Sequence, residues 1–440
     1  MVQAAGRLDT LLKETLGGPL PLRLRAWDGS EVGPSDAPTL VVRSRRALHR
    51  LLWRPGELGL ARAWVAGEIT VEGDLYEALG RLAPLLWQHT EEPTERRSRV
   101  PRPDPRLLRL AGQVLALAGP SLPPAPPREE VPPRRGLKHT LLRDRQAISH
   151  HYDVGNDFYA LVLGPSMVYS CGYWPEPDST LEQAQADKLD LVCRKLALRP
   201  GQRLLDVGCG WGSMVLHAAE HYGVHAVGVT ISVEQADLAR KRVVDAGLTD
   251  RVEIRVQDYR QIDDGPFDAI SSIGMAEHVG SAAYLTYAQQ LHRLLKPGGR
   301  LLNHQIARPP RTDESTYSVD EFIDRYVFPD GELAPVGNTV SLLEQAGFEV
   351  RDLESIREHY ALTLRAWVTN LERNWDEAVR LVTPARARIW RLYMAASAVA
   401  FEQNGIGVNQ ILAVRPRSGG ASGMPLVRGP WQPGSAATDH

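Results

Sequence analysis

The sequence predicts an α/β protein with a mainly parallel sheet, preceded by a small α+β domain. Short apolar, strand-like runs recur as "RLLDVG", "GVHAVGVTIS", "RVEIRVQD", "FDAISSIG" and "GRLLNHQIA", and helix-type patterns separate them. This alternation is typical of a parallel α/β sheet. The first run continues through "GCGWG" into the helix pattern "SMVLHAAEHYG". A glycine-rich turn between strand and helix presents free backbone N–H groups to a ligand.

The length and the local composition divide the chain into four parts. A chain of 440 residues exceeds the usual size of one domain, so more than one hydrophobic core is expected. Residues 1–90 combine helix patterns with the strand pattern "EITVEGDL" and predict the α+β domain. Residues 91–136 form a linker rich in proline and arginine, with a helix over "LLRLAGQVLALAG". Residues 137–415 form the α/β domain, and residues 416–440 form a poorly ordered tail.

Composition excludes several classes of protein. With 43% hydrophobic and 24% charged residues, the chain is typical of globular proteins. We find no apolar run of the ~20 residues that a membrane span needs and no signal peptide, so a cytoplasmic location is expected. Cys171, Cys193 and Cys209 are too few and too irregularly spaced for a disulfide framework or a four-ligand zinc site, so no metal is expected. A net charge of −2 excludes a globally basic nucleic-acid-binding protein.

An excess of arginine between Arg96 and Arg145 allows two interpretations. In the first, the segment binds an anionic membrane surface, and each basic residue contributes about 1 kcal/mol to the binding free energy. Alternatively, it is a solvated linker that proline stiffens. The sequence does not separate the two.

The glycine turn predicts a nucleotide-type ligand site, but several kinds of site share such a turn. Gly208, Gly210 and Gly212 are spaced more tightly than in the dinucleotide-binding fingerprint. Cys209 lies inside the turn, where no neighbour in the sequence would lower its pKa, so we expect it to be a packing residue.

Several motifs in a fixed order carry a family resemblance. "LLDVGCGWGS", "GVTISVEQ", "VQDYR", "SIGMAEHVG" and "LKPGGRLLNHQI" resemble the S-adenosylmethionine-dependent cyclopropane-fatty-acid synthases, with their mycolic-acid and mid-chain methylene-forming relatives. The resemblance covers Asp144 to Arg415, and "GLARAWVAGEITVEGDL" resembles the N-terminal module of longer members. It implies a Rossmann-like methyltransferase domain with a seven-stranded sheet, and a homodimer.

The resemblance implies a set of residues that bind S-adenosylmethionine. The glycine turn would hold the methionine part, "TISVEQ" the ribose and "QDY" the adenine. The upstream segment "SHHYDVGNDFYALVLGPSMVYSCGYW" resembles the family's lid and adds two contacts. The implied residues are Tyr169, Ser170, Asp206, Gly208, Gly210, Trp211, Gly212, Thr230, Gln235, Gln257, Asp258 and Tyr259. Asp237, near the expected ribose site, is interpreted as a surface helix residue.

The implied reaction makes two demands on the protein. A sulfonium methyl group is already activated, but an isolated alkene is a weak nucleophile, and its attack leaves a carbocation in the acyl chain. The cation then loses a proton from the added methyl group. This chemistry needs an apolar channel with electron-rich rings, and one positioned base. Aromatic residues cluster in the lid and again over residues 317–328.

In the family, a bound bicarbonate supplies the base. The motifs that hold it map onto Cys171, Glu277, His304, the backbone of Ile306 and Tyr360. N–H and O–H donors would bind the anion, and the glutamate would orient it. Each residue also has a structural interpretation: Glu277 as a helix cap, His304 as a satisfied buried histidine and Tyr360 as a core residue.

One position departs from the family pattern. Relatives carry a late cysteine where this chain has Ser397 in "AASAVAF". A thioester mechanism at that position is therefore disfavoured.

Three functions remain open. The leading one is methyl transfer to the cis double bond of an unsaturated phospholipid at the inner membrane face, giving a cyclopropane or a methylene product. A methylene product would need a separate reductase to become a methyl branch. The alternatives are a small-molecule N-methyltransferase and a non-catalytic lipid-binding protein.

Overall fold

The computed structural model describes residues 3–87, 105–132, 143 and 154–427. They form two compact units, one of residues 1–133, 315–327 and 383–399, the other of residues 134–314, 328–382 and 400–440. The first unit therefore includes two segments that the sequence alone placed within the α/β domain. Seven of the eleven arginines between Arg96 and Arg145, and residues 428–440 of the predicted tail, lie outside the described residues.

The first unit is built on a four-stranded sheet in the order β2-β1-β3-β4. β1 (Arg23–Arg25) pairs parallel to β3 (Thr39–Val42), whereas β2 (Glu31–Val32) and β4 (Ile69–Glu72) are antiparallel to their neighbours. Thus "EITVEGDL" contains a strand, as predicted. The helices are α1 (Ala4–Leu16), α2 (Arg46–Trp53), α3 (Glu57–Val65), α4 (Leu75–Trp87) and α5 (Pro105–Ala118). The last of these is the helix predicted within the linker.

The ionic contacts of this unit connect its sequence-distant segments. Glu68 is buried and accepts hydrogen bonds from Arg50 Nε at 2.8 Å and Nη2 at 3.1 Å. Glu130 accepts from Arg62 at 2.7 Å and from Arg325 and the Tyr326 hydroxyl at 3.0 Å each. A buried carboxylate needs such partners to offset its desolvation.

The second unit contains the predicted sheet, seven-stranded in the order β10-β11-β9-β8-β5-β6-β7. β5 (Arg203–Val207), β6 (His225–Thr230), β7 (Val252–Val256), β8 (Phe267–Ile273) and β9 (Leu295–Ala307) pair in parallel. β11 (Gly407–Val414) runs antiparallel between β9 and β10 (Glu349–Ser355). The mainly parallel α/β fold is confirmed.

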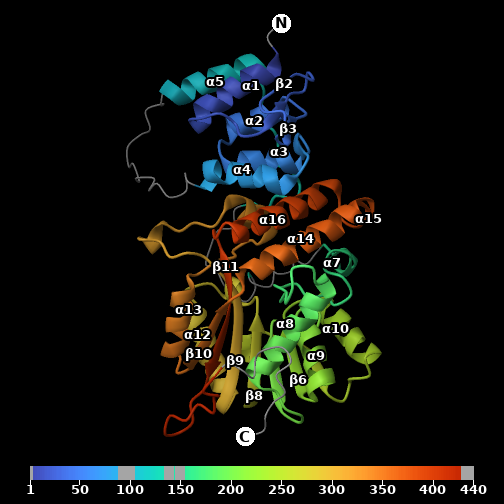
Figure 1. Cartoon of the computed structure of the whole chain (residues 1–440), viewed down its shortest axis with the longest axis vertical. Helices are drawn as coiled ribbons and strands as arrows, with labels where there is room; N and C mark the ends of the chain where they lie inside the picture. The colour runs from blue at the N-terminus through green and yellow to red at the C-terminus, as the bar shows by residue number, and fades with distance from the viewer. Residues whose placement is uncertain (1–2, 88–104, 133–142, 144–153, 428–440) are drawn as a thin grey trace. The chain divides into compact units, whose positions relative to one another are not determined.

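Helices cover both faces of this sheet, as Figure 1 shows. On one face α8 (Leu181–Leu196), α9 (Ser213–Tyr222) and α10 (Val233–Asp245) pack on a core that includes Leu204. On the other, α12 (Tyr284–Leu294) and α13 (Val336–Gln345) pack on a core that includes Leu205. Neighbouring strand residues point to opposite faces, which explains why the central strands β5, β6 and β8 are largely buried along their length. The second unit also contains α7 (Asn156–Leu163), α11 (Ala276–Val279), α14 (Arg357–Arg373) and α15 (Trp375–Leu381), whereas most of α16 (Pro384–Glu402) belongs to the first unit.

The strand order places a ligand site. From β5 the chain continues to β6 and β7 on one side, then returns to β8 on the other side of β5. In open α/β sheets a crevice forms at the carboxyl ends of the strands where the order reverses. The ends of β5 and β8 are therefore the expected floor of the site.

Candidate active site

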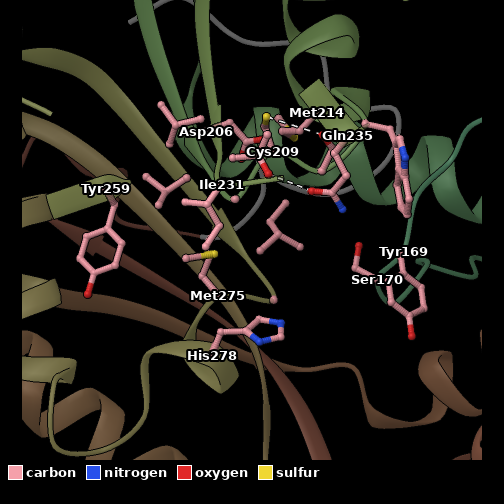
Figure 2. A pocket seen from close by; sticks show the side chains of 18 of the residues that line it. Tyr169, Ser170, Asp206, Cys209, Met214, Ile231, Gln235, Tyr259, Met275 and His278 are labelled. Atoms are coloured by element: carbon pink, nitrogen blue, oxygen red, sulfur yellow. Dashed lines mark hydrogen bonds between the residues drawn. The ribbon is translucent and has the colours of Figure 1, made fainter. Parts of the chain in front are cut away.

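A cavity lies at the reversal point, lined by the ends of β5, β6, β7 and β8 and by the 167–170 segment. Figure 2 shows Asp206, Gln235 and Cys209 on one side of it, Met275 and His278 on another, and Tyr169 and Ser170 across from them. Every cofactor-binding residue implied by the sequence lines this cavity except Gly212. Gly212 instead precedes α9 with a φ of 82°, in the left-handed region.

The glycine turn fits a ligand that approaches the backbone. Gly210 has a φ of 54°, and a Cβ there would meet no atom within 4 Å, so it would project into open space. At Gly208, with a φ of 79°, a Cβ would lie 2.4 Å from the sulfur of Met275. The left-handed backbone thus favours glycine at 208, and glycine leaves the backbone exposed to the cavity at 210.

The polar lining has a donor and acceptor pattern suited to an amino acid and a ribose. Thr230 Oγ1 donates to Gln235 Oε1 at 2.8 Å, which orients that amide. The Asp258 carboxylate pairs with Arg260 at 2.7 Å. Asp237 is exposed on α10 and pairs with Arg240 at 3.0 Å, as expected for a surface residue.

Asp206 and Lys188 are both buried and both line the cavity, and the charge of each affects the pKa of the other. Burial raises the pKa of Asp206 to about 6, while the hydroxyl of Ser271, which donates to it at 2.7 Å, and the charge of Lys188 act in the opposite direction. Burial also lowers the pKa of Lys188 to about 8, which the charge of Asp206 partly offsets. Lys188 Nζ donates to Ser170 Oγ at 3.0 Å. The pair provides a negative group beside the glycine turn and fixes Ser170.

The sequence interpretation missed Lys188 and His278, both of which line the cavity. Lys188 lies within the helix pattern "DKLDLVCRKL", where a lysine looks like a solvated residue, yet its exposure is 2%. His278 directly follows Glu277, and its ring lies 5.9 Å from that of Phe328, edge to face. Its adjacency to a proposed catalytic residue was the available signal.

Cys209 behaves as a packing residue. It is buried beside Gly228, where an added Cβ would lie 2.9 Å from the Cys209 Cβ. Burial raises the pKa of its thiol well above the usual value. A thiol in this state is a poor nucleophile.

The five residues assigned to the anion site do not line the main cavity, but several are close neighbours. Glu277 Oε1 accepts a 2.7 Å hydrogen bond from the backbone N–H of Ile306, and both residues line a smaller adjoining pocket. Burial raises the pKa of Glu277 to about 7, and the Ile306 N–H acts against this rise. The sequence assigned the Ile306 N–H to the anion; here it serves the glutamate.

Cys171 and His304 are both fully buried near Lys188, whose charge affects the pKa of each. The Cys171 thiol donates to the carbonyl of Gly172 at 3.1 Å. His304 pairs across the sheet with Gln410 of β11. The backbone N–H of Gly274, a cavity residue, donates to the His304 carbonyl at 2.9 Å, which places His304 behind the cavity wall.

Tyr360 is connected to the cavity through aromatic rings. Its ring lies 6.0 Å from that of Trp367, edge to face, and Trp367 lies 5.3 Å from Tyr169. Tyr159 lies 5.4 Å from Tyr169 and 4.7 Å from Trp211. These rings form an aromatic wall on this side of the cavity, to which Tyr159 and Tyr169 of the upstream segment contribute.

Glu277 Oε2 and His304 Nε2 are buried atoms that have no hydrogen-bond partner among the described residues. One is an acceptor when ionised and the other a potential donor. Bicarbonate has both an O–H group and anionic oxygens, so this donor set fits it. Ser397 lies on α16, and neither pocket includes it.

Comparison with known proteins identifies the family. The family model for mycolic acid cyclopropane synthetase matches residues 139–411. A Mycobacterium tuberculosis protein named "Probable fatty acid methyltransferase Rv3720" is 45% identical over 95% of this chain and 96% of its own length. The cyclopropane-fatty-acyl-phospholipid synthase of Escherichia coli K12 is 39% identical over 60% of this chain and 66% of its own.

The structural comparison agrees. The crystal structure of the mycolic acid cyclopropane synthase CmaA1 complexed with SAH and CTAB is 33% identical, covers 63% of this chain and 99% of that chain, and has a TM-score of 0.58. The fold, the glycine turn and these matches support one conclusion. The chain belongs to the mycolic acid cyclopropane synthetase family and is an S-adenosylmethionine-dependent methyltransferase.

Proposed function

We propose that the chain transfers a methyl group to the cis double bond of an unsaturated phospholipid acyl chain. The single observation that carries this proposal is the pairing of a cofactor cavity with a buried, largely uncharged wall of aromatic rings behind Tyr169. An amine substrate carries its positive charge before the reaction and would be bound by accessible carboxylates. An alkene develops a positive charge only during the reaction, and the faces of aromatic rings stabilise that charge.

Each residue has a defined part in this reaction. S-adenosylmethionine, when bound, supplies an electrophilic methyl group. Asp206, Gly210 and Gln235 would hold it, since they line the cavity where the strand order reverses. The rings of Tyr169, Trp367 and Tyr360 would stabilise the positive charge that develops on the acyl chain and exclude water from it.

The proton must then leave the added methyl group. Glu277 and His304 would hold a bicarbonate there, which would supply the base, with Cys171 and Tyr360 closing the site as the resemblance implies. Glu277 Oε2 and His304 Nε2 are the atoms with hydrogen-bonding capacity to spare. Proton loss with ring closure gives a cyclopropane, and a hydride shift before proton loss gives an exocyclic methylene.

One incubation tests the proposal. The purified chain receives methyl-labelled S-adenosylmethionine and vesicles of unsaturated phospholipid, and the lipid fraction is analysed. We expect label in the fatty acids. Because the two products are isomers, proton NMR separates them through upfield ring protons or vinylidene protons. Labelled small amines with unlabelled lipid would overturn the proposal in favour of an N-methyltransferase, and no labelled product at all would refute the proposed lipid substrate.

We further propose that the first unit brings the enzyme to a membrane surface. Among the described residues, no helix combines the length and the apolar character that crossing a bilayer requires. Trp53, Leu115 and Leu122 are exposed by 51%, 42% and 86% on this unit, and tryptophan favours membrane interfaces. The arginine excess between Arg96 and Arg145 adds the charge that anionic lipids attract. A homodimer, and a reductase acting on a methylene product, remain part of the proposal through the family resemblance.

A further inference from the structure

A chain of buried polar side chains runs through the sheet behind the cavity. Glu354 on β10 forms an ion pair with Lys195 of α8. Lys195 Nζ also donates to Gln410 Oε1 at 2.8 Å. The Gln410 amide nitrogen lies 3.4 Å from His304 Nδ1. Lys195, Gln410 and His304 are exposed by 1%, 0% and 2%, so water does not compete for these contacts.

The lysine fixes the orientation of the glutamine. An ammonium group can only donate hydrogen bonds, so the atom of Gln410 that faces it must be the carbonyl oxygen. The amide NH₂ group then faces His304. The opposite orientation would bring two donors together at Lys195, at a buried site where an unsatisfied donor is costly.

The glutamine in turn fixes the histidine. The Gln410 NH₂ group can only donate, so His304 Nδ1 must accept and carries no proton. A neutral imidazole has one N–H, which must therefore be at Nε2. Burial holds the pKa of His304 well below its usual range, and the charges of Lys188 and Lys195 act in the same direction.

We propose that Gln410, oriented by Lys195, is a positioning residue that fixes His304 as the neutral tautomer protonated on Nε2, so that His304 presents a donor to the anion site. Nε2 is the buried atom that lacks a partner among the described residues. The assignment of the tautomer stands on the contacts alone, and its use as an anion donor rests on the proposed function.

The tautomer has a direct chemical consequence. With its proton on Nδ1, His304 would turn a lone pair toward the anion and repel it. As an imidazolium, it would be an acid beside the base that the reaction requires. A neutral N–H donor binds the anion without protonating it.

The test uses the full chain with ¹⁵N-labelled histidine and long-range ¹H–¹⁵N correlation spectra, which distinguish the two neutral tautomers and the cation. A His304→Gln variant assigns the signals. At neutral pH we expect His304 to show the pattern of a proton on Nε2. In Gln410→Glu, a carboxylate can accept from both Lys195 and His304, so the proton should move to Nδ1. An exposed substitution on the same helix as Lys195, Gln183→Glu, should leave the pattern unchanged.

A second variant protects the test against misfolding of Gln410→Glu. In Lys195→Met the amide of Gln410 is free to rotate, so a mixture of both tautomers is expected. A wild-type signal with the proton on Nδ1, an imidazolium signal, or a pattern that neither variant changes would overturn the proposal. The expected spectra without lipid methylation would leave the tautomer assigned and refute the proposed function. Lipid methylation together with spectra other than those expected would support the proposed function and refute the assigned tautomer.

Discussion

Glu277 Oε1 and the backbone N–H of Ile306 form a 2.7 Å hydrogen bond that joins α11 to β9. The bond leaves Glu277 Oε2 as the free end of a buried carboxyl group. In Glu277→Gln the amide oxygen still accepts from Ile306, but the other end becomes a donor. We expect turnover to fall by about a hundredfold or more, with the affinity for S-adenosylmethionine nearly unchanged.

Methyl incorporation into lipid and calorimetric titration of the cofactor measure these two effects. Glu332→Gln is the matched control, since Glu332 lines the same smaller pocket but accepts from the Ser281 hydroxyl at 2.7 Å. Equal activity of Glu277→Gln and Glu332→Gln would remove Glu277 from the reaction.

The pH dependence should report the same carboxyl group. Burial raises the pKa of Glu277 to about 7, and the ionised form is the one that orients the anion. Activity should therefore fall as the pH drops below about 7. The measurement keeps the bicarbonate concentration constant at each pH and the cofactor saturating. A profile that stays flat down to the usual range of a glutamate would contradict this expectation.

Lys188→Met should weaken cofactor binding. Methionine fills the same space, but Ser170 loses its donor and Asp206 loses the nearby charge that favours its ionised form. A neutral Asp206 is a weaker partner for the ammonium group of the cofactor, so we expect the Kd to rise by roughly tenfold or more. Lys241→Met, an exposed substitution on α10, is the control. An unchanged Kd in Lys188→Met would show that the buried cation does not serve the cofactor.

Replacing Arg96, Arg97, Arg99, Arg134 and Arg135 by glutamine tests the membrane surface. Binding to anionic vesicles should weaken, and its dependence on salt should decrease, because fewer charges are screened. The comparison variant replaces the exposed Arg351, Arg373 and Arg380. Wild-type binding that salt does not affect, or that the first set of substitutions leaves unchanged, would support the solvated linker instead.

The strands that the sequence predicted carry clear apolar patterns. β5, β6 and β8 are largely buried, and β7 alternates buried with more exposed residues. In contrast, β10, "EVRDLES", is polar and half-buried at the sheet edge. Segments 315–327 and 383–399 pack with the N-terminal domain because of contacts far apart in sequence, such as Trp64 Nε1 to the Arg388 carbonyl at 2.9 Å. No local pattern encodes such pairings.

The cofactor site was accessible to motif reading because one turn and three strand ends carry it. The chain of buried polar side chains behind the cavity could not be predicted from motifs. Lys195, Gln410 and His304 come from three different elements, and their roles depend on how the folded chain orients them toward one another. The Ile306 N–H donates to Glu277 rather than to the predicted anion for the same reason. The position of α11, not the motif around Ile306, determines which acceptor it meets.

The three cysteines of this chain are all buried, and burial raises the pKa of each thiol well above its usual value. Thiol-reactive dyes and spin labels should therefore spare the native protein at neutral pH. A cysteine introduced at an exposed position of either unit would then be the preferred attachment point. Labels for distance measurements by fluorescence or electron paramagnetic resonance could therefore be attached to introduced cysteines without first replacing the three native ones.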